Sequence, residues 1–160
     1  MTQDAATRQR LQFLVRVVRR ESEHLALTDR RLYQQPFTSA RAIALQDNAD
    51  EAERVEAFVG RFGRLQDTLG DKLLPAYLSA EGESPGTALD RLDRAEQLGL
   101  LSSADEWLAM RKLRNQMVHE YIEDPNILAD ALNNGHRFVP ILLDVAEALT
   151  QAIGRRGWLQ

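Results

Sequence analysis

The residues of this chain best suited to catalysis occur together between positions 114 and 121, as Arg114, Asn115, His119 and Tyr121. Arginine stays charged at every working pH and presents a planar fork that suits phosphate oxygens. Histidine is the side chain whose unperturbed pKa lies closest to neutrality, so it can take up or release a proton. An arginine and a histidine in one segment therefore favour the hypothesis of phosphodiester cleavage without a metal ion.

The spacing of these residues decides which of them can act together. In a straight helix, Arg114 and His119 point about 140° away from each other, because each residue turns the helix by about 100°. Arg111, Asn115 and His119 share one face at spacing i, i+4, i+8. Arg114 and Tyr121 share another face, seven residues apart. A straight helix therefore does not bring Arg114 and His119 to one phosphate.

Two arrangements would let Arg114 and His119 reach the same phosphate. The helix can fray or tighten near His119, since Asp124 and Pro125 follow shortly after. Alternatively, two copies of the helix meet across a two-fold axis and each supplies part of a joint site. The second arrangement also supplies a second histidine, and cleavage through a ribose 2′-hydroxyl uses both a base and an acid. Both arrangements remain open at this point.

The same residues also have an ordinary structural interpretation. Cations near a helix C-terminus complement the helix dipole by ~0.3–1 kcal/mol. Asn115 can bond to a neighbouring loop, and Tyr121 can pack in the core with its hydroxyl at the rim. The residue types alone therefore do not establish an active site.

The charge of the chain limits how it can bind nucleic acid. Its 160 residues carry a formal net charge of −4, which argues against a general positive field that coats nucleic acid. An RNA-binding protein of this composition needs a local basic patch. The candidate patches are Arg16, Arg19 and Arg20 in the first helix, and Arg111, Lys112 and Arg114 beside the motif. Solvated helix faces are the alternative for both groups.

Several classes of site are excluded or disfavoured by composition. The chain has no cysteine, which excludes a disulfide framework, a thiol nucleophile and a thiolate metal site. No spacing of histidines and carboxylates indicates a metal site, and we expect neither metal nor cofactor. The N-terminus lacks an apolar signal core, and no apolar run approaches the roughly 18–20 residues that span a bilayer. We therefore expect a cytoplasmic protein that does not associate with membranes.

Apolar residues at spacing i, i+3, i+4, i+7 predict helices along most of the chain. The first helix carries Leu11, Leu14 and Val18 inward, and a long helix is expected over residues 48–79. Residues 81–86 read as a loop, and Thr87, Ser103 and Asp124 occupy helix-capping positions. No strand pattern or internal repeat is found. The sequence predicts one all-α domain over residues 1–160, an antiparallel bundle of four to five helices.

Glycines and prolines inside the expected helices need an explanation. Gly60, Gly63 and Gly70 lie in the long helix, where each costs roughly 1 kcal/mol relative to alanine. Close approach of another helix is one explanation, and a flexible or bent helix is the alternative. Pro75 is expected to kink the end of this helix. Gly135 and Pro140 interrupt the apolar pattern of the last segment, and a kink is expected at Pro140.

Two carboxylates of the long helix are further candidates. Asp67 and Asp71 share a face at spacing i, i+4 and can orient His119 or support a cleft. A solvated face is the alternative. Beyond the last helix, Trp158 predicts a tail that docks on the bundle or on a partner.

With Arg114, Asn115, His119 and Tyr121 the chain resembles the HEPN superfamily, and within it the HepT-like proteins. The family pattern is Arg, four to six residues, then His, with Asn after the Arg and Tyr two residues after the His. The preceding residues 98–107 (LGLLSSADEW) also resemble the family's lead-in to this motif. The resemblance extends over about residues 48–153, and the family places the motif late in an all-α bundle of about this size.

This resemblance implies a metal-independent endoribonuclease that acts as a homodimer on RNA. It also implies the toxin of a type VII-like toxin–antitoxin pair, whose partner is a minimal nucleotidyltransferase that silences the toxin by adding AMP to the motif tyrosine. Carried over to this chain, His119 is the acid–base group, Arg114 binds the phosphate, Asn115 orients the site and Tyr121 is modified. Arg111 and Lys112 are candidate RNA-binding residues beside it.

The resemblance leaves a second function open. Some relatives are described only as substrate-binding partners of nucleotidyltransferases, so the chain can instead be a non-catalytic HEPN module that presents a helix to such an enzyme. A purely structural bundle is the third alternative. RNA cleavage distinguishes the first function from the other two.

Overall fold

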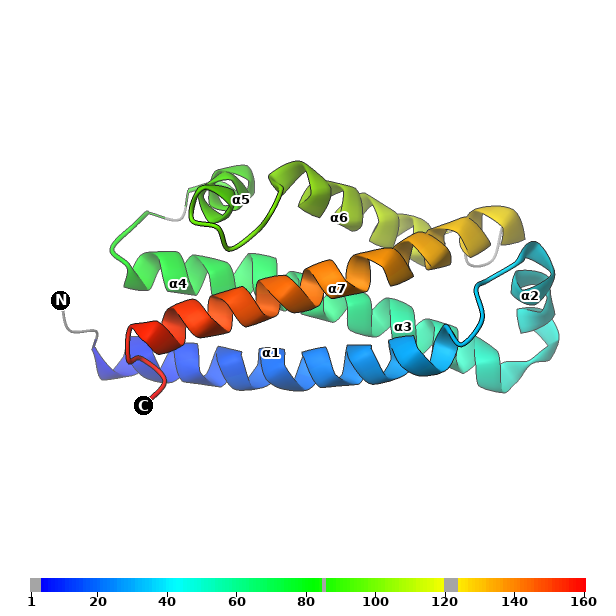
Figure 1. The fold of residues 1–160 in the computed structure, drawn as a ribbon, viewed down its shortest axis with the longest axis horizontal. Helices are drawn as coiled ribbons and strands as arrows, with labels where there is room; N and C mark the ends of the chain where they lie inside the picture. The colour runs from blue at the N-terminus through cyan, green and yellow to red at the C-terminus, as the bar shows by residue number, and fades with distance from the viewer. Residues whose placement is uncertain (1–3, 85, 120–123) are drawn as a thin grey trace.

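The structure is a computed structural model, and it describes residues 4–84, 86–119 and 124–160. The described residues form helices and no strand (Figure 1). In chain order the elements are α1 (Ala5–Leu32), α2 (Ser39–Ala44), the 3-10 turn η1 (Leu45–Asp47), α3 (Ala49–Asp67), the π-helical segment η2 (Thr68–Leu73), α4 (Leu74–Ala80), α5 (Ala88–Gln97), α6 (Ala104–His119) and α7 (Pro125–Arg155). The predicted all-α class is confirmed.

The long helices run in alternating directions along one axis. In Figure 1, α1 and α6 run one way, and α7 and the α3–η2–α4 rod run the other. The helices α2 and α5 are short, with 6 and 10 residues. The bundle is therefore antiparallel, and the number of its helices depends on whether these short ones are included.

A cluster of buried apolar side chains runs the length of the bundle. It extends from Leu11 in α1 to Trp158 after α7, and its largest fully buried side chains include Phe58 and Phe62 of α3. Of the two partners predicted for the C-terminal tail, the structure shows the bundle, because Trp158 is 6% exposed and lies near Tyr77. No helix in the described part of the chain is both long and apolar enough to cross a membrane.

The helix caps agree with the predicted ones. The Thr87 hydroxyl accepts the Asp90 N–H, and the Asp90 carboxylate accepts the Thr87 N–H, which makes a full capping box. Ser103 Oγ accepts the Glu106 N–H at 3.1 Å at the start of α6. These caps set where α5 and α6 begin.

The long helix predicted over residues 48–79 is interrupted by the π-helical segment η2. At its end the Leu74 N–H bonds to Leu69 O, five residues back, rather than four. Pro75 follows directly and has no N–H to donate, while its ring needs room beside the preceding turn. The widened π turn provides that room, so α4 continues the rod through residue 80.

Close helix approach accounts for two of the three glycines in this rod. A Cβ at Gly63 would lie 2.5 Å from Arg114 Nε, and one at Gly70 would lie 3.2 Å from Trp107 Cζ2. Both neighbours belong to α6. A Cβ at Gly60 would meet nothing nearer than 3.9 Å, so the predicted close approach does not apply there.

The last helix continues through the proline at which the sequence predicts a kink. The α7 helix continues through Gly135 and Pro140 to Arg155. Val139 and Leu142, on either side of the proline, are 2% and 0% exposed. Their packing holds the helix although proline removes a backbone hydrogen bond there. Gly135 instead allows close packing, because a Cβ there would lie 3.1 Å from Met117 Sδ.

Candidate active site on helix α6

The candidate motif lies at the C-terminal end of α6. This helix is fixed on its inner side by Trp107, Met110, Leu113 and Met117, which are all buried. Glu96 of α5 accepts the Ala104 N–H at 2.8 Å and ties the start of α6 to the neighbouring helix. The buried side chains recur at helical spacing, so the sequence of α6 determines which motif residues face inward and which face outward.

Arg114 lies near the inner side of α6 and contacts the long rod. Its Nη1 donates to Asp67 Oδ1 at 2.6 Å, and its side chain is 32% exposed. The guanidinium lies over Gly63, where any larger residue would place a Cβ 2.5 Å from Nε. The charged group is therefore held in one place between a carboxylate and a bare helix backbone, and it still reaches solvent.

Asp67 and Asp71 pair with arginines of α6. Arg111 Nη1 lies 3.9 Å from Asp71 Oδ1, and both side chains are nearly half exposed. Of the alternatives predicted for these carboxylates, the structure does not show contact with His119, since Asp67 pairs with Arg114 and Asp71 lies near Arg111. Ion pairs this exposed contribute about 0–1 kcal/mol to stability, so their main effect is on where the guanidinium groups lie.

His119 and Asn115 lie on the exposed side of α6. Neither side chain hydrogen-bonds or ion-pairs with another described residue. The helix stays regular through His119, so Arg114 and His119 point about 140° apart within one chain. Tyr121 lies outside the described residues.

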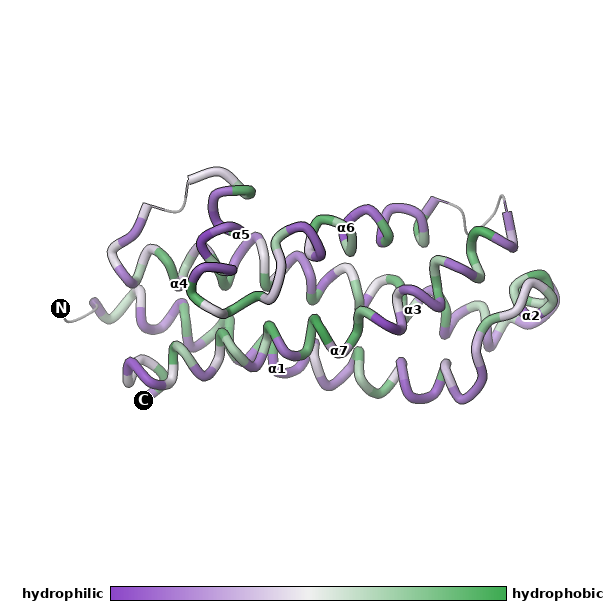
Figure 2. Tube along the Cα trace, turned by 45° about the horizontal axis from the view of Figure 1, so that its top comes forward, coloured by the Kyte–Doolittle hydropathy of each residue, from purple (hydrophilic) through white to green (hydrophobic). Residues whose placement is uncertain are grey.

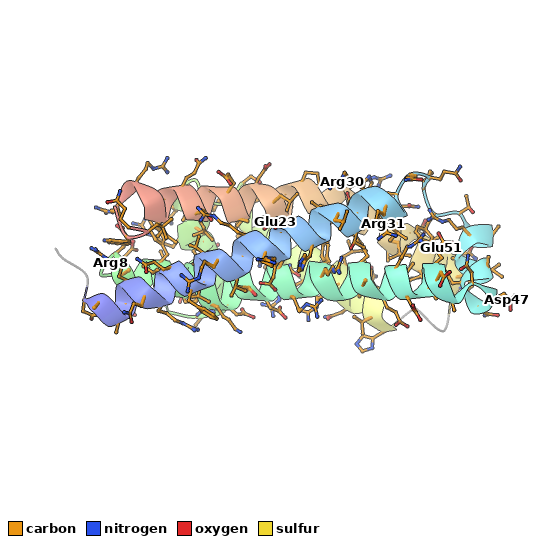
Figure 3. All side chains as sticks on the ribbon, turned by 90° about the horizontal axis from the view of Figure 1, so that it is seen from below. Arg8, Glu23, Arg30, Arg31, Asp47 and Glu51 are labelled. Atoms are coloured by element: carbon orange, nitrogen blue, oxygen red, sulfur yellow. The ribbon has the colours of Figure 1, made fainter. Side chains whose placement is uncertain are left out.

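The two basic patches differ in their surroundings. Arg16, Arg19 and Arg20 are exposed on α1, where Glu23 follows one turn later. Figure 3 labels Arg8, Glu23, Arg30 and Arg31 on this helix, so α1 carries both signs of charge. Lys112 instead lines an open groove between α6 and α7, together with Gln116, Arg137 and Phe138. Beside α6, basic side chains of two helices, Lys112 of α6 and Arg137 of α7, therefore share one groove.

Sequence reasoning missed a carboxyl behind this site. Glu21 of α1 faces Thr68, and burial raises the pKa of its carboxyl, although the Thr68 hydrogen bond and the charges of Arg64 and Lys72 oppose the increase. Its Oε1 is buried without a hydrogen-bond partner. Asp67 also faces it and adds to the raised pKa. Glu21 lies on the side of α1 that otherwise faces inward. A carboxylate on that side is the sequence signal that could have indicated this buried group.

Comparisons with protein-family models, with curated proteins and with solved structures find no match to this chain. Among residues 4–84, 86–119 and 124–160, no group of three or more histidines and carboxylates is placed to hold a metal ion. The candidate site therefore consists of a positioned guanidinium, an exposed imidazole and an exposed amide on one helix.

Proposed function

We propose that this chain is a metal-independent endoribonuclease of the HEPN type and the toxin of a toxin–antitoxin pair. The observation that carries the proposal is that Asp67 anchors Arg114, while His119, five residues later on the same helix, is exposed. A cation that is already held in place stabilises the negative charge that develops on a phosphate in the transition state. The imidazole remains accessible to a substrate.

The proposed reaction needs one base, one acid and one cation. The imidazole of His119 takes the proton of a ribose 2′-hydroxyl, and the 2′-oxygen attacks the adjacent phosphorus. The bond from phosphorus to the 5′-oxygen breaks, and that oxygen receives a proton as it leaves. Arg114 binds the non-bridging phosphate oxygens, where its planar fork suits their geometry. Asn115 lies on the His119 face and orients the bound strand.

The geometry of α6 favours a homodimer for this reaction. Because Arg114 and His119 diverge by about 140° on a helix that is regular through His119, one chain does not present both groups to one phosphate. Two α6 helices that meet across a two-fold axis can place Arg114 of one subunit near His119 of the other. A dimer of this kind also supplies a second histidine as the acid.

Silencing by a nucleotidyltransferase completes the proposal. AMP on Tyr121 would add bulk and a phosphate charge two residues from His119. That negative charge would compete with the RNA phosphate for Arg114. The antitoxin is therefore a protein that binds this end of α6 and carries a nucleotide.

RNA cleavage in EDTA by purified protein without AMP on Tyr121 tests the proposal. We expect cleavage by the natural chain, and a loss of at least a hundredfold in both His119→Ala and Arg114→Ala. His24→Ala and Arg30→Ala are matched controls, since they change the same residue types at exposed positions of α1 outside the Arg16, Arg19 and Arg20 patch. Unchanged activity in both site variants overturns the mechanism. Absence of cleavage with tight binding of a nucleotidyltransferase would support the non-catalytic alternative instead.

A further inference from the structure

One face of α7 beside α6 has an apolar centre and charged residues at both sides. It consists of Asn134, Arg137, Phe138, Ile141, Asp144, Val145 and Ala148, at helical spacing. We call these residues the α7 stripe. Figure 2 shows both hydrophobic and hydrophilic residues along α7. Phe138, Ile141 and Ala148 are half-buried, so the stripe exposes apolar surface without being part of the closed core.

Two open grooves meet on this stripe. The first lies between α6 and α7 and is lined by Leu113, Phe138 and Ile141, with Lys112 and Arg137 beside them. The second lies where the α5–α6 loop passes α7 and is lined by Leu100, Leu101, Ile141 and Val145, with Glu96 and Asp144 beside them. Ile141 belongs to both grooves. They therefore form one surface with a basic half and an acidic half.

Arg137 of the basic half and Asp144 of the acidic half form no ion pair among the described residues. Arg137 Nη1 donates to Asn134 Oδ1 at 2.9 Å, and Asp144 has no ion-pair partner among the described residues. Arg137 and Asp144 are seven residues apart, about 10 Å along the helix, so they share a face but are too far apart to bond to each other. Each is free to pair with an opposite charge from outside.

We propose that a second copy of this chain docks antiparallel on the α7 stripe, with a two-fold axis near Ile141. Arg137 lies four residues before Ile141 and Asp144 three residues after it. An antiparallel copy centred there therefore places Arg137 against Asp144 of the partner subunit, and the same pair forms again on the other side of the axis. Apolar side chains fill the centre between the two pairs, as in the core and rim of protein interfaces. The self-complementary order of charges favours a second copy over an unrelated partner.

This contact is separate from the dimer of the proposed function. Met117, two residues before His119, packs against Gly135, which lies six residues or about 9 Å before Ile141 along α7. A two-fold axis at Ile141 would leave the two His119 side chains roughly 18 Å or more apart, too far to share a phosphate. The α7 stripe therefore adds a second two-fold contact. A chain that uses both contacts assembles beyond a dimer.

Charge reversal tests the pairing across the axis. We expect Arg137→Asp and Asp144→Arg each to weaken self-association by at least tenfold in sedimentation equilibrium. The double variant Arg137→Asp/Asp144→Arg restores association, because every pair across the axis is then reversed together. Both residues are exposed, so circular dichroism should show all three variants folded. The proposal is overturned if both single variants self-associate as strongly as the natural chain, or if the double variant does not recover self-association.

A symmetric disulfide gives an independent test in a chain without cysteine. Ile141→Cys should form a covalent dimer on oxidation, since the two residues at position 141 face each other across the axis. Glu147→Cys, exposed elsewhere on α7, is the matched control and should stay monomeric on a non-reducing gel. Equal cross-linking of both variants, or none at position 141, contradicts the proposal. His119→Ala should leave the association unchanged, so loss of the nuclease and loss of this contact can be told apart.

Discussion

The guanidinium of Arg114 lies directly over Gly63. A Cβ at position 63 would be 2.5 Å from Arg114 Nε and 2.9 Å from Cζ, both closer than real side-chain contacts. Asp67, one turn further along α3, accepts the hydrogen bond that holds the same group. One turn of α3 therefore supplies both the space and the anchor for the cation of the candidate site.

Gly63→Ala should move Arg114 without unfolding the bundle. The added methyl group displaces a flexible side-chain end rather than a helix backbone, so we expect the fold to persist and the contact with Asp67 to break. RNA cleavage should fall at least tenfold in an assay with EDTA. Gly60→Ala is the matched control, because its Cβ meets nothing nearer than 3.9 Å. It should keep full activity and raise the free energy of unfolding by about 0.5–1 kcal/mol. Full activity in Gly63→Ala would contradict the role of the Arg114 position.

Asp67→Asn should loosen Arg114 at little cost in stability. The pair is partly exposed, so we expect the free energy of unfolding to change by less than about 1 kcal/mol. Cleavage should fall severalfold with the change mainly in kcat, since the guanidinium keeps its charge but loses its orientation. Asp71→Asn is the control, because its arginine lies 3.9 Å away. Equal kcat values for the two variants would argue against a positioning role for Asp67.

Glu21→Gln should stabilise the protein at neutral pH. Burial raises the pKa of the Glu21 carboxyl in the folded state, so folding favours its neutral form. Below the pKa of the unfolded chain both states are protonated and the ionisation has no cost. The cost grows as pH rises through the raised pKa, so the variant should gain stability at pH 7 and lose this gain near pH 3. Thermal unfolding of the natural chain and the variant between about pH 3 and pH 7 measures this difference in stability. Glu23→Gln, exposed on α1, should show no such pH dependence.

Asp124→Ala should weaken the start of α7. The Asp124 carboxylate accepts the N–H groups of Asn126 and Ile127 and so caps this helix. Loss of a helix cap costs about 0.5–2 kcal/mol, which chemical denaturation can measure. Asp130→Ala changes an exposed aspartate inside the same helix and should alter stability by less than 0.5 kcal/mol, a rough limit for surface positions. Equal losses in both would show that Asp124 does not act as a cap.

Local signals of this chain predicted local structure well. Helical spacing and capping residues indicated the all-α class, the start of α5 at Thr87 and the start of α6 at Ser103. These features depend on residues a few positions apart, which a sequence displays directly. The divergence of Arg114 and His119 also followed from helix geometry alone.

Features that depend on distant residues could not be predicted in the same way. The anchoring of Arg114 joins residues 47 positions apart in different helices. The π turn before Pro75 and the packing of Trp107 against Gly70 are also not visible in helical periodicity. Likewise the glycines at 60 and 63 look alike in the sequence. The structure separates them, because α6 approaches only the second of this pair.

Co-expression of differently tagged Arg114→Ala and His119→Ala chains tests most directly whether two subunits share one site. In a mixed dimer one intact Arg114 and one intact His119 remain, and they come from different subunits. If the groups act across the two-fold axis, purified mixed dimers should cleave RNA in EDTA well above either variant alone, and below the natural dimer because only one of its two histidines is left to serve as base while water supplies the proton to the leaving oxygen. Activity no greater than that of the single variants would contradict the shared site.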